Sequence, residues 1–236
     1  MKKILHRAAD RGHADHGWLK TDYSFSFSNY YNPEKVHFGL LRVLNDDTIA
    51  GGMGFGMHPH DNMEIVTIVM EGAVKHKDSM GNTEVISAGE IQVMSAGTGI
   101  THAESNNSPT APLKLFQIWV FPSEKNIKPR YDQKKLDLSK HENKLEAIIS
   151  PGKEPGTLWI NQDAWFLLGK FTEESSFSYK PQKQGNGVYV FVIEGAVEVD
   201  GEKLGKRDAT GISDYESVEI KPSNNTELLF IDVPMR

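Results

Sequence analysis

Four side chains in two short motifs have the types and spacing of metal ligands. The motif "GFGMHPHDNMEIVTIVMEG", residues 54–72, contains His58 and His60 directly before an apolar, β-branched run. Alternate side chains of a strand share a face, so both imidazoles can reach one ion. The motif "AGEIQVMSAGTGITHAESN" repeats this spacing with His102 and Glu104. Three imidazoles and one carboxylate predict a site for Fe(II), Mn, Co, Ni, Cu or Zn.

Three glycines precede the first histidine pair at alternate positions. Gly52, Gly54 and Gly56 have the parity of His58, and their missing side chains are expected to leave room beside the ion. An octahedral ion with four protein ligands keeps two positions for a substrate and for O₂ or water. The chain has no cysteine, so thiolate ligands, disulfides and cysteine nucleophiles are excluded.

The composition is that of an ordinary globular protein. Hydrophobic residues make up 38% and charged residues 25% of the 236 positions, and the net charge is −6. This balance supplies no general field for a phosphate backbone, so we expect no sequence-specific nucleic-acid binding. No apolar run is long enough for a membrane span or a signal peptide, and we expect a cytoplasmic protein without membrane contact.

Short apolar runs separated by turn residues predict an all-β chain with an internal repeat. Turn residues separate apolar runs such as "LKLFQIWVF" and "GVYVFVIEGAVEVDG" along the chain. The polar segment 123–147 divides the chain into two halves. The run "VTIVMEGAVKH" (66–76) aligns with "YVFVIEGAVEV" (189–199). This similarity predicts a duplicated β domain, with residues 1–135 and 136–236 as the two halves.

Two sets of residues resemble the sequence motifs of cupins. The first set is Gly52, His58, His60, Glu64 and Gly72, and the second is Gly89, Gly99, His102 and Asn106. Between Glu64 and Gly72 the chain has one residue more than the cupin motif. Within the cupins, "GWLKTDYSFSFSNYY", "GFGMHPHDNMEI" and "LFQIWVFP" resemble landmarks of pirin and pirin-like proteins. The resemblance covers almost the whole N-terminal half, and the C-terminal half more loosely.

The resemblance implies a fold, a metal and an activity. Two jelly-roll-type cupin barrels, a bicupin, would pack face to face, with one iron in the N-terminal barrel at the residues matching His58, His60, His102 and Glu104. Several pirin-like proteins are associated with quercetin 2,3-dioxygenase activity, which opens the central flavonol ring with O₂. By that resemblance Glu104 would also be the catalytic base for the flavonol hydroxyl. Glu64 would support the ligands without binding the ion.

The second half lacks the ligand residues. When the two halves are aligned, the residues of the second half that correspond to the four ligands are Pro181, Lys183, Ile220 and Pro222. We therefore expect one divalent transition metal per chain, Fe(II) by resemblance, and a structural second barrel that contributes to the pocket entrance. His76, in "KHKDSMGN", is expected only to hydrogen-bond a hairpin turn.

Two other functions remain open from the sequence. Pirins are also associated with binding regulators and metabolic enzymes, so the chain could be a non-enzymatic iron-binding redox sensor with a protein partner. A metal-dependent isomerase also fits cupin geometry and needs no O₂. The dioxygenase interpretation implies a small aromatic flavonol and O₂ as its substrates.

Overall fold

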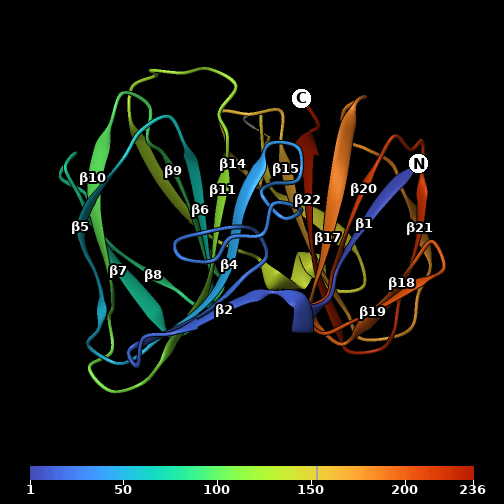
Figure 1. Cartoon of the computed structure of the whole chain (residues 1–236), viewed down its shortest axis with the longest axis horizontal. Helices are drawn as coiled ribbons and strands as arrows, with labels where there is room; N and C mark the ends of the chain where they lie inside the picture. Colours follow the sequence, from blue (N-terminus) through green and yellow to red (C-terminus); the bar gives the residue numbers. More distant parts are fainter. Residues whose placement is uncertain (153) are drawn as a thin grey trace.

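Strands make up nearly all regular structure in the computed structural model, which describes residues 1–152 and 154–236. Two barrels lie side by side, and each combines a seven-stranded with a four-stranded sheet (Figure 1). The expected all-β bicupin fold is confirmed. The described residues include two short 3₁₀ helices, η1 (Ala8–Asp10) and η2 (Leu138–His141).

The first barrel contains the strands of the N-terminal half from β2 onward. Its larger sheet has the order β12-β9-β6-β11-β4-β3-β2, and its smaller sheet the order β5-β10-β7-β8. The bounds are β2 (Gly12–Asp15), β3 (Leu19–Tyr23), β4 (Leu41–Ile49), β5 (Gly54–His60), β6 (Glu64–Glu71), β7 (Ala73–Asp78), β8 (Thr83–Ser87), β9 (Glu90–Ser95), β10 (Ile100–Asn106), β11 (Leu113–Val120) and β12 (Arg130–Lys135).

The second barrel repeats this arrangement with shorter strands in its smaller sheet. Its larger sheet has the order β1-β20-β17-β22-β15-β13-β14, and its smaller sheet the order β16-β21-β18-β19. The bounds are β1 (Lys2–His6), β13 (Leu145–Ser150), β14 (Leu158–Trp159), β15 (Trp165–Phe171), β16 (Phe177–Tyr179), β17 (Asn186–Glu194), β18 (Ala196–Val199), β19 (Glu202–Gly205), β20 (Ala209–Ser213), β21 (Val218–Pro222) and β22 (Thr226–Pro234).

The strand β1 lies in the second barrel although it comes from the N-terminal half. It pairs antiparallel with β20, and Thr210 Oγ1 donates a hydrogen bond of 3.0 Å to the Ile4 carbonyl. The chain then crosses back along β2 to the first barrel (Figure 1). The expected division into residues 1–135 and 136–236 stays a prediction. The strand β1 belongs to the first of these segments but lies in the second barrel.

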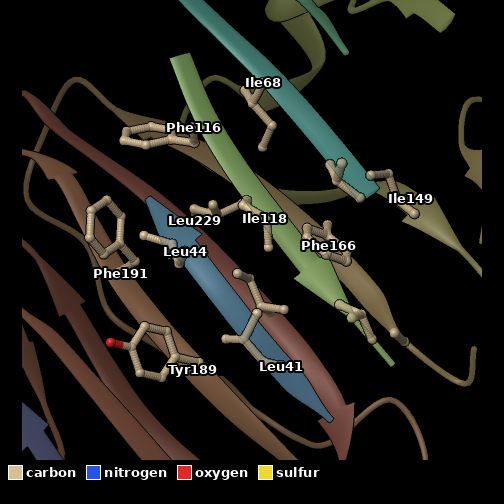
Figure 2. Close-up of a cluster of buried hydrophobic side chains, with 14 of the residues drawn as sticks. Leu41, Leu44, Ile68, Phe116, Ile118, Ile149, Phe166, Tyr189, Phe191 and Leu229 are labelled. Carbon is tan, nitrogen blue, oxygen red and sulfur yellow. The ribbon is translucent and has the colours of Figure 1, made fainter. Parts of the chain in front are cut away.

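The two larger sheets face each other across a shared apolar core. Side chains from both halves meet there, and Figure 2 shows Phe116 and Ile118 of β11 near Phe191 and Leu229 of the second barrel. The ring centroids of Phe116 and Phe191 are 5.4 Å apart. Burial of apolar side chains stabilises by about 1.5–3 kcal/mol each, so this interface fixes the barrels against each other.

The barrel interiors differ in polarity. The second barrel has one apolar cluster that includes Val190, Val199, Ile220 and Phe230. Apolar residues of the first barrel form two smaller clusters, one around Ile86 and one of Ile65, Met94, Ala96 and Ile100. The same barrel also buries Thr67, His76, Gln92, His102 and Glu104. The second barrel also buries polar residues, among them Asn186, Thr210 and Asp232, but its positions matching Thr67, His76 and His102 are the apolar Val190, Val199 and Ile220.

No helix in the described part of the chain is long and apolar enough to cross a membrane. The cytoplasmic location expected from the sequence stays a prediction.

Candidate metal centre and its cavity

Two neighbouring strands bring three histidines together. The strands β5 and β10 are antiparallel, with His58 opposite His102 and His60 opposite Ile100. The ring centroid of His102 is 4.4 Å from that of His58 and 4.9 Å from that of His60. One nitrogen from each ring can be chosen so that all three lie within 4.8 Å of one another. This spacing suits a shared ion.

The environment keeps the rings of His60 and His102 neutral, as metal ligation requires. Burial and the neighbouring His58 lower the pKa of His60 to about 4. Burial, and then His58 and His60, lower the pKa of His102 to about 3. His58 Nδ1 donates a hydrogen bond of 2.8 Å to the Gly56 carbonyl, which leaves Nε2 as the nitrogen with a free lone pair.

Glu104 lies on β10 beyond a bulge that separates it from His102. Gln117 Nε2 donates a hydrogen bond of 2.9 Å to its Oε2. Burial, and then the nearby Asp47, raise the pKa of Glu104 to about 7. Its carboxylate falls in a second group, with His76 and His102, whose ligand atoms also lie within 4.8 Å of one another. The sequence-predicted ligands are thus brought to one place, but in two overlapping groups.

Unpaired polar atoms mark the same place. Within the described residues, both ring nitrogens of His102 and Oε1 of Glu104 are buried without a hydrogen-bond partner. Buried polar groups are nearly always paired, and an orphaned imidazole nitrogen or carboxylate oxygen is a free electron-pair donor. These residues therefore fit a transition metal with nitrogen and oxygen ligands. That the four side chains bind the ion stays a prediction.

His76 is the functional candidate that sequence reasoning missed. The expected hydrogen bond to the hairpin turn is present, because His76 Nε2 bonds Asp78 Oδ2 at 3.2 Å, but the ring is also fully buried inside the first barrel. Its ring centroid is 5.3 Å from that of His102 and 4.6 Å from that of Tyr131. The signal was the spacing of His76 and Asp78, the same two-residue interval as in the metal-type pairs.

A cavity of about 470 Å³ opens beside the histidine group. Trp18 and Phe55 pack with ring centroids 5.2 Å apart, and Phe27 and Trp119 with centroids 5.3 Å apart. The cavity walls are therefore largely aromatic. The lining residues are Trp18, Phe27, Asn45, Asp47, Gly54, Phe55, Gly56, His58, His60, Glu104, Gln117 and Trp119.

Polar groups in the wall of this cavity have hydrogen-bonding capacity to spare. Asn45 Oδ1 and Trp119 Nε1 are buried and have no partner in the described chain. Burial raises the pKa of Asp47 to about 7, so this carboxyl can be neutral near neutral pH. Residues that carry an unpaired acceptor, an unpaired donor and a carboxyl therefore line a ligand-sized space.

Of the three glycines expected to leave room beside the ion, the structure supports this role at Gly56. Gly54 and Gly56 both line the cavity, and a Cβ at Gly56 would meet no atom within 4 Å. A Cβ at Gly54 would lie 2.3 Å from the Glu104 carbonyl oxygen, so this glycine permits close strand packing. Gly52 lies in the preceding turn with φ of +70°.

Glu64 lies at the contact between the barrels and not behind the ligands. Its Oε2 accepts hydrogen bonds from Ser95 Oγ at 2.8 Å and from the Asn161 amide at 3.1 Å. The expected supporting role is wrong, because Asn62 adopts φ of +45° between β5 and β6 and the two strands enter different sheets. The parity counted from His60 therefore does not continue to Glu64.

The second barrel offers no comparable group in the part of the chain that the structure describes. Ile220 is fully buried in the apolar cluster, and Pro222 ends β21. Lys183 is exposed and pairs with Asp163 at 2.5 Å. These positions agree with a second barrel that lacks metal ligands. Its expected contribution to the pocket entrance is wrong, because every described residue that lines the cavity beside the histidines belongs to the first half.

Comparisons with known proteins agree with this architecture. The Pirin family model matches residues 5–120, and the model described as the quercetinase C-terminal cupin domain matches residues 147–233. A protein of Escherichia coli strain K12 named quercetin 2,3-dioxygenase is 43% identical over 234 residues, 98% of each chain. A protein of Caulobacter vibrioides named pirin-like is 39% identical over 222 residues, 94% of this chain and 95% of the relative.

A solved structure matches the whole chain. The bacterial pirin YhhW of Escherichia coli, determined in complex with nickel(II), is 40% identical, covers 99% of both chains and superposes with a TM-score of 0.93. The fold and the histidine group define the protein as a bicupin whose candidate metal centre lies in the first barrel. It belongs to the pirin family.

Proposed function

We propose that the protein is a metal-dependent dioxygenase of the quercetin 2,3-dioxygenase type, acting on flavonols. The observation that carries the proposal is the cavity of about 470 Å³, which has His58, His60 and Glu104 and several aromatic side chains in its wall. The relative from Escherichia coli with 43% identity is named for this activity. The matching Escherichia coli pirin holds nickel(II), which supports a transition metal here.

His58, His60, His102 and Glu104 would hold one divalent ion per chain, and we propose Fe(II). The neutral rings of His60 and His102 and the unpaired oxygen of Glu104 support this assignment. When bound, a redox-active ion supplies Lewis acidity and the electrons for reaction with O₂.

The aromatic side chains bind and shield the substrate. Trp18 and Phe55 on one side and Phe27 and Trp119 on another provide flat, apolar surface for a planar polyphenol. Their packing also excludes water from the ring that reacts.

The polar groups of the wall orient the substrate. Asn45 Oδ1 can accept a hydrogen bond from a phenolic hydroxyl, and Trp119 Nε1 can donate one to the flavonol carbonyl. Asp47 can bind a second hydroxyl, because its carboxyl is buried in the same wall. A hydroxylated substrate would satisfy atoms that have no partner within the described chain.

Glu104 would take the proton from the flavonol hydroxyl. Its pKa of about 7, raised by burial, suits a proton acceptor near neutral pH. Oε1 would bind the ion, and Oε2, which accepts the 2.9 Å hydrogen bond from Gln117 Nε2, has a second lone pair that would take this proton.

Oxygen uptake with a panel of flavonols tests the proposal. Iron-loaded wild type should consume O₂, and Glu104→Gln should lose about 10²–10⁴-fold in turnover, as expected when a general base is removed. Glu64→Gln is the matched control, because Glu64 is a buried glutamate whose pKa is also raised to about 7 but which does not line the cavity. Iron content is measured on every sample.

If iron-loaded wild type consumes no O₂ with any flavonol, the dioxygenase proposal is wrong, and the non-enzymatic iron-binding interpretation takes its place. If only the Glu104→Gln variant keeps normal turnover, the activity stands and the base is another group.

A further inference from the structure

The second group of metal-type side chains lies entirely in the barrel interior. We call His58, His60 and His102 the outer set, and His76, His102 and Glu104 the inner set. In β7 His76 is the cross-strand partner of Glu104 in β10. The exposed fractions of His76, His102 and Glu104 are 0%, 1% and 3%. The inner set is therefore more deeply buried than the outer set, whose other two histidines line the cavity.

The two sets differ in their donor chemistry. The outer set offers three imidazoles, whereas the inner set offers two imidazoles and one carboxylate. Among divalent transition metals, Mn(II) is the one that carboxylate ligands suit best. Ni(II) and Cu(II) are well served by imidazoles alone. The sets should thus differ in the ion that they prefer.

Unpaired atoms favour a ligand role for both shared residues. Neither ring nitrogen of His102 has a hydrogen-bond partner among the described residues. Glu104 Oε1 also has no hydrogen-bond partner among the described residues. His102 can therefore offer a nitrogen to either set, and Glu104 has an oxygen available for the inner one.

A buried carboxylate holds the His76 ring. His76 Nε2 donates to Asp78 Oδ2 at 3.2 Å, and the same carboxylate oxygen accepts from Asn82 Nδ2 at 2.7 Å. A carboxylate that fixes the tautomer and orientation of an imidazole is a common support of metal-ligating histidines. Nδ1 of His76 then keeps the lone pair, which accepts a hydrogen bond of 3.3 Å from Gln92 Nε2 that a bound ion would replace.

The geometry points to a second, inner metal position in the first barrel, held by His76, His102 and Glu104 and overlapping the outer position. Because His102 belongs to both sets, each chain holds one ion at a time. Mn(II) would favour the inner position, whereas Fe(II) and Ni(II) would favour the outer position. This inference concerns metal binding and does not depend on flavonol turnover.

Removal of the outer set isolates the inner one. The double variant His58→Ala/His60→Ala is titrated with Co(II), whose visible spectrum reports its ligands, against a competing chelator. It should still bind one Co(II) per chain, with an affinity lowered by about 100-fold, and addition of His76→Ala should remove this binding. As the matched control, addition of His141→Ala should change nothing, because His141 is a buried histidine that bonds Leu168 O in the second half.

Two results would overturn the inner position. One is that the double variant, folded by circular dichroism, binds no Co(II). The other is that His76→Ala leaves its Co(II) affinity and spectrum unchanged. If His76→Ala does not fold, His76→Gln in the same background keeps a side chain of similar size without the imidazole, and the same loss of cobalt is expected. Oxygen uptake is not measured, so failure of the dioxygenase proposal would not affect the outcome.

Discussion

The two barrels share a sheet arrangement but differ in what they bury. Aligned through Glu71 and Glu194, Thr67 and His76 of the first barrel correspond to Val190 and Val199 of the second. Gln117 pairs with Thr67 across the sheet, as Phe230 pairs with Val190. All three counterparts belong to the apolar cluster. One scaffold thus holds either an apolar core or a polar layer with unpaired donors.

The two barrels also differ in how fully each hydrogen-bonds a buried carboxylate. Asp232 in the second barrel accepts hydrogen bonds from Tyr179 Oη at 2.8 Å, the Gln182 amide at 3.0 Å and Asn186 Nδ2 at 2.7 Å. Glu104 in the first barrel accepts one bond and has an unpaired oxygen within the described chain. The satisfied carboxylate stabilises its barrel, and the unsatisfied one is available for chemistry.

The largest expected loss of stability comes from placing an imidazole in the apolar interior. Ile220→His puts a histidine at the counterpart of His102, inside the apolar cluster of the second barrel. This should lower the free energy of unfolding by about 4 kcal/mol. Urea denaturation of the metal-free protein measures this loss, and Ile220→Val should cost only about 1 kcal/mol. A loss below 1 kcal/mol for Ile220→His would show that the second barrel tolerates a polar interior.

Glu64 tests the contact between the two barrels. Burial raises its pKa from 4.5 to about 7, so between these values the unfolded chain releases a proton that the folded chain keeps. Stability therefore falls as the pH rises from 4.5 to 7. Glu64→Gln lacks this dependence and should gain up to about 3 kcal/mol relative to wild type over that interval. Urea titrations of both metal-free proteins at several pH values check this, and a constant difference would contradict the raised pKa.

Asp232→Asn and Glu104→Gln sharpen the contrast between the two carboxylates. An amide at Asp232 must direct its NH₂ at one of three donors and should cost about 2 kcal/mol. An amide at Glu104 can keep the bond to Gln117 and should cost under about 1 kcal/mol in the metal-free protein. Thermal unfolding in the presence of a chelator compares the two. Equal losses would mean that both carboxylates serve stability alike.

The smallest expected change in stability is at His102. His102→Leu replaces a ring whose nitrogens lack partners in the described chain, so the metal-free variant should unfold within about 1 kcal/mol of wild type. Metal binding should nevertheless disappear, because His102 belongs to both the outer and the inner set. Chelator competition and urea denaturation on one preparation separate the two effects. Retained metal would remove His102 from the ligands.

Local pattern was sufficient to predict the barrels and the outer set. Strand alternation placed His58 and His60 on one face, and the repeated spacing suggested that His102 joins them. His76 was missed because its role depends on the pairing of β7 with β10, and the spacing of His76 and Asp78 does not by itself reveal that pairing. Glu64 was misplaced because a single residue of positive φ, Asn62, ended the alternation before it.

The pairing of β1 could not be read from the sequence for a related reason. Thr210 Oγ1 reaches the Ile4 carbonyl across 206 positions of chain, and the partner strand carries no complementary motif. Long-range strand pairing is decided by the whole fold and not by the segments that pair.

The crossing of β1 also constrains the order in which the molecule can be completed. Residues 2–6 are synthesised long before residues 209–213, with which they pair. While the ribosome makes the intervening chain, this segment has no sheet to join, and its exposed Ile4 and Leu5 add apolar surface to the nascent polypeptide. The edge strand β1 can therefore pair with β20 only after nearly the whole chain has been synthesised, so the last link between the two halves forms late.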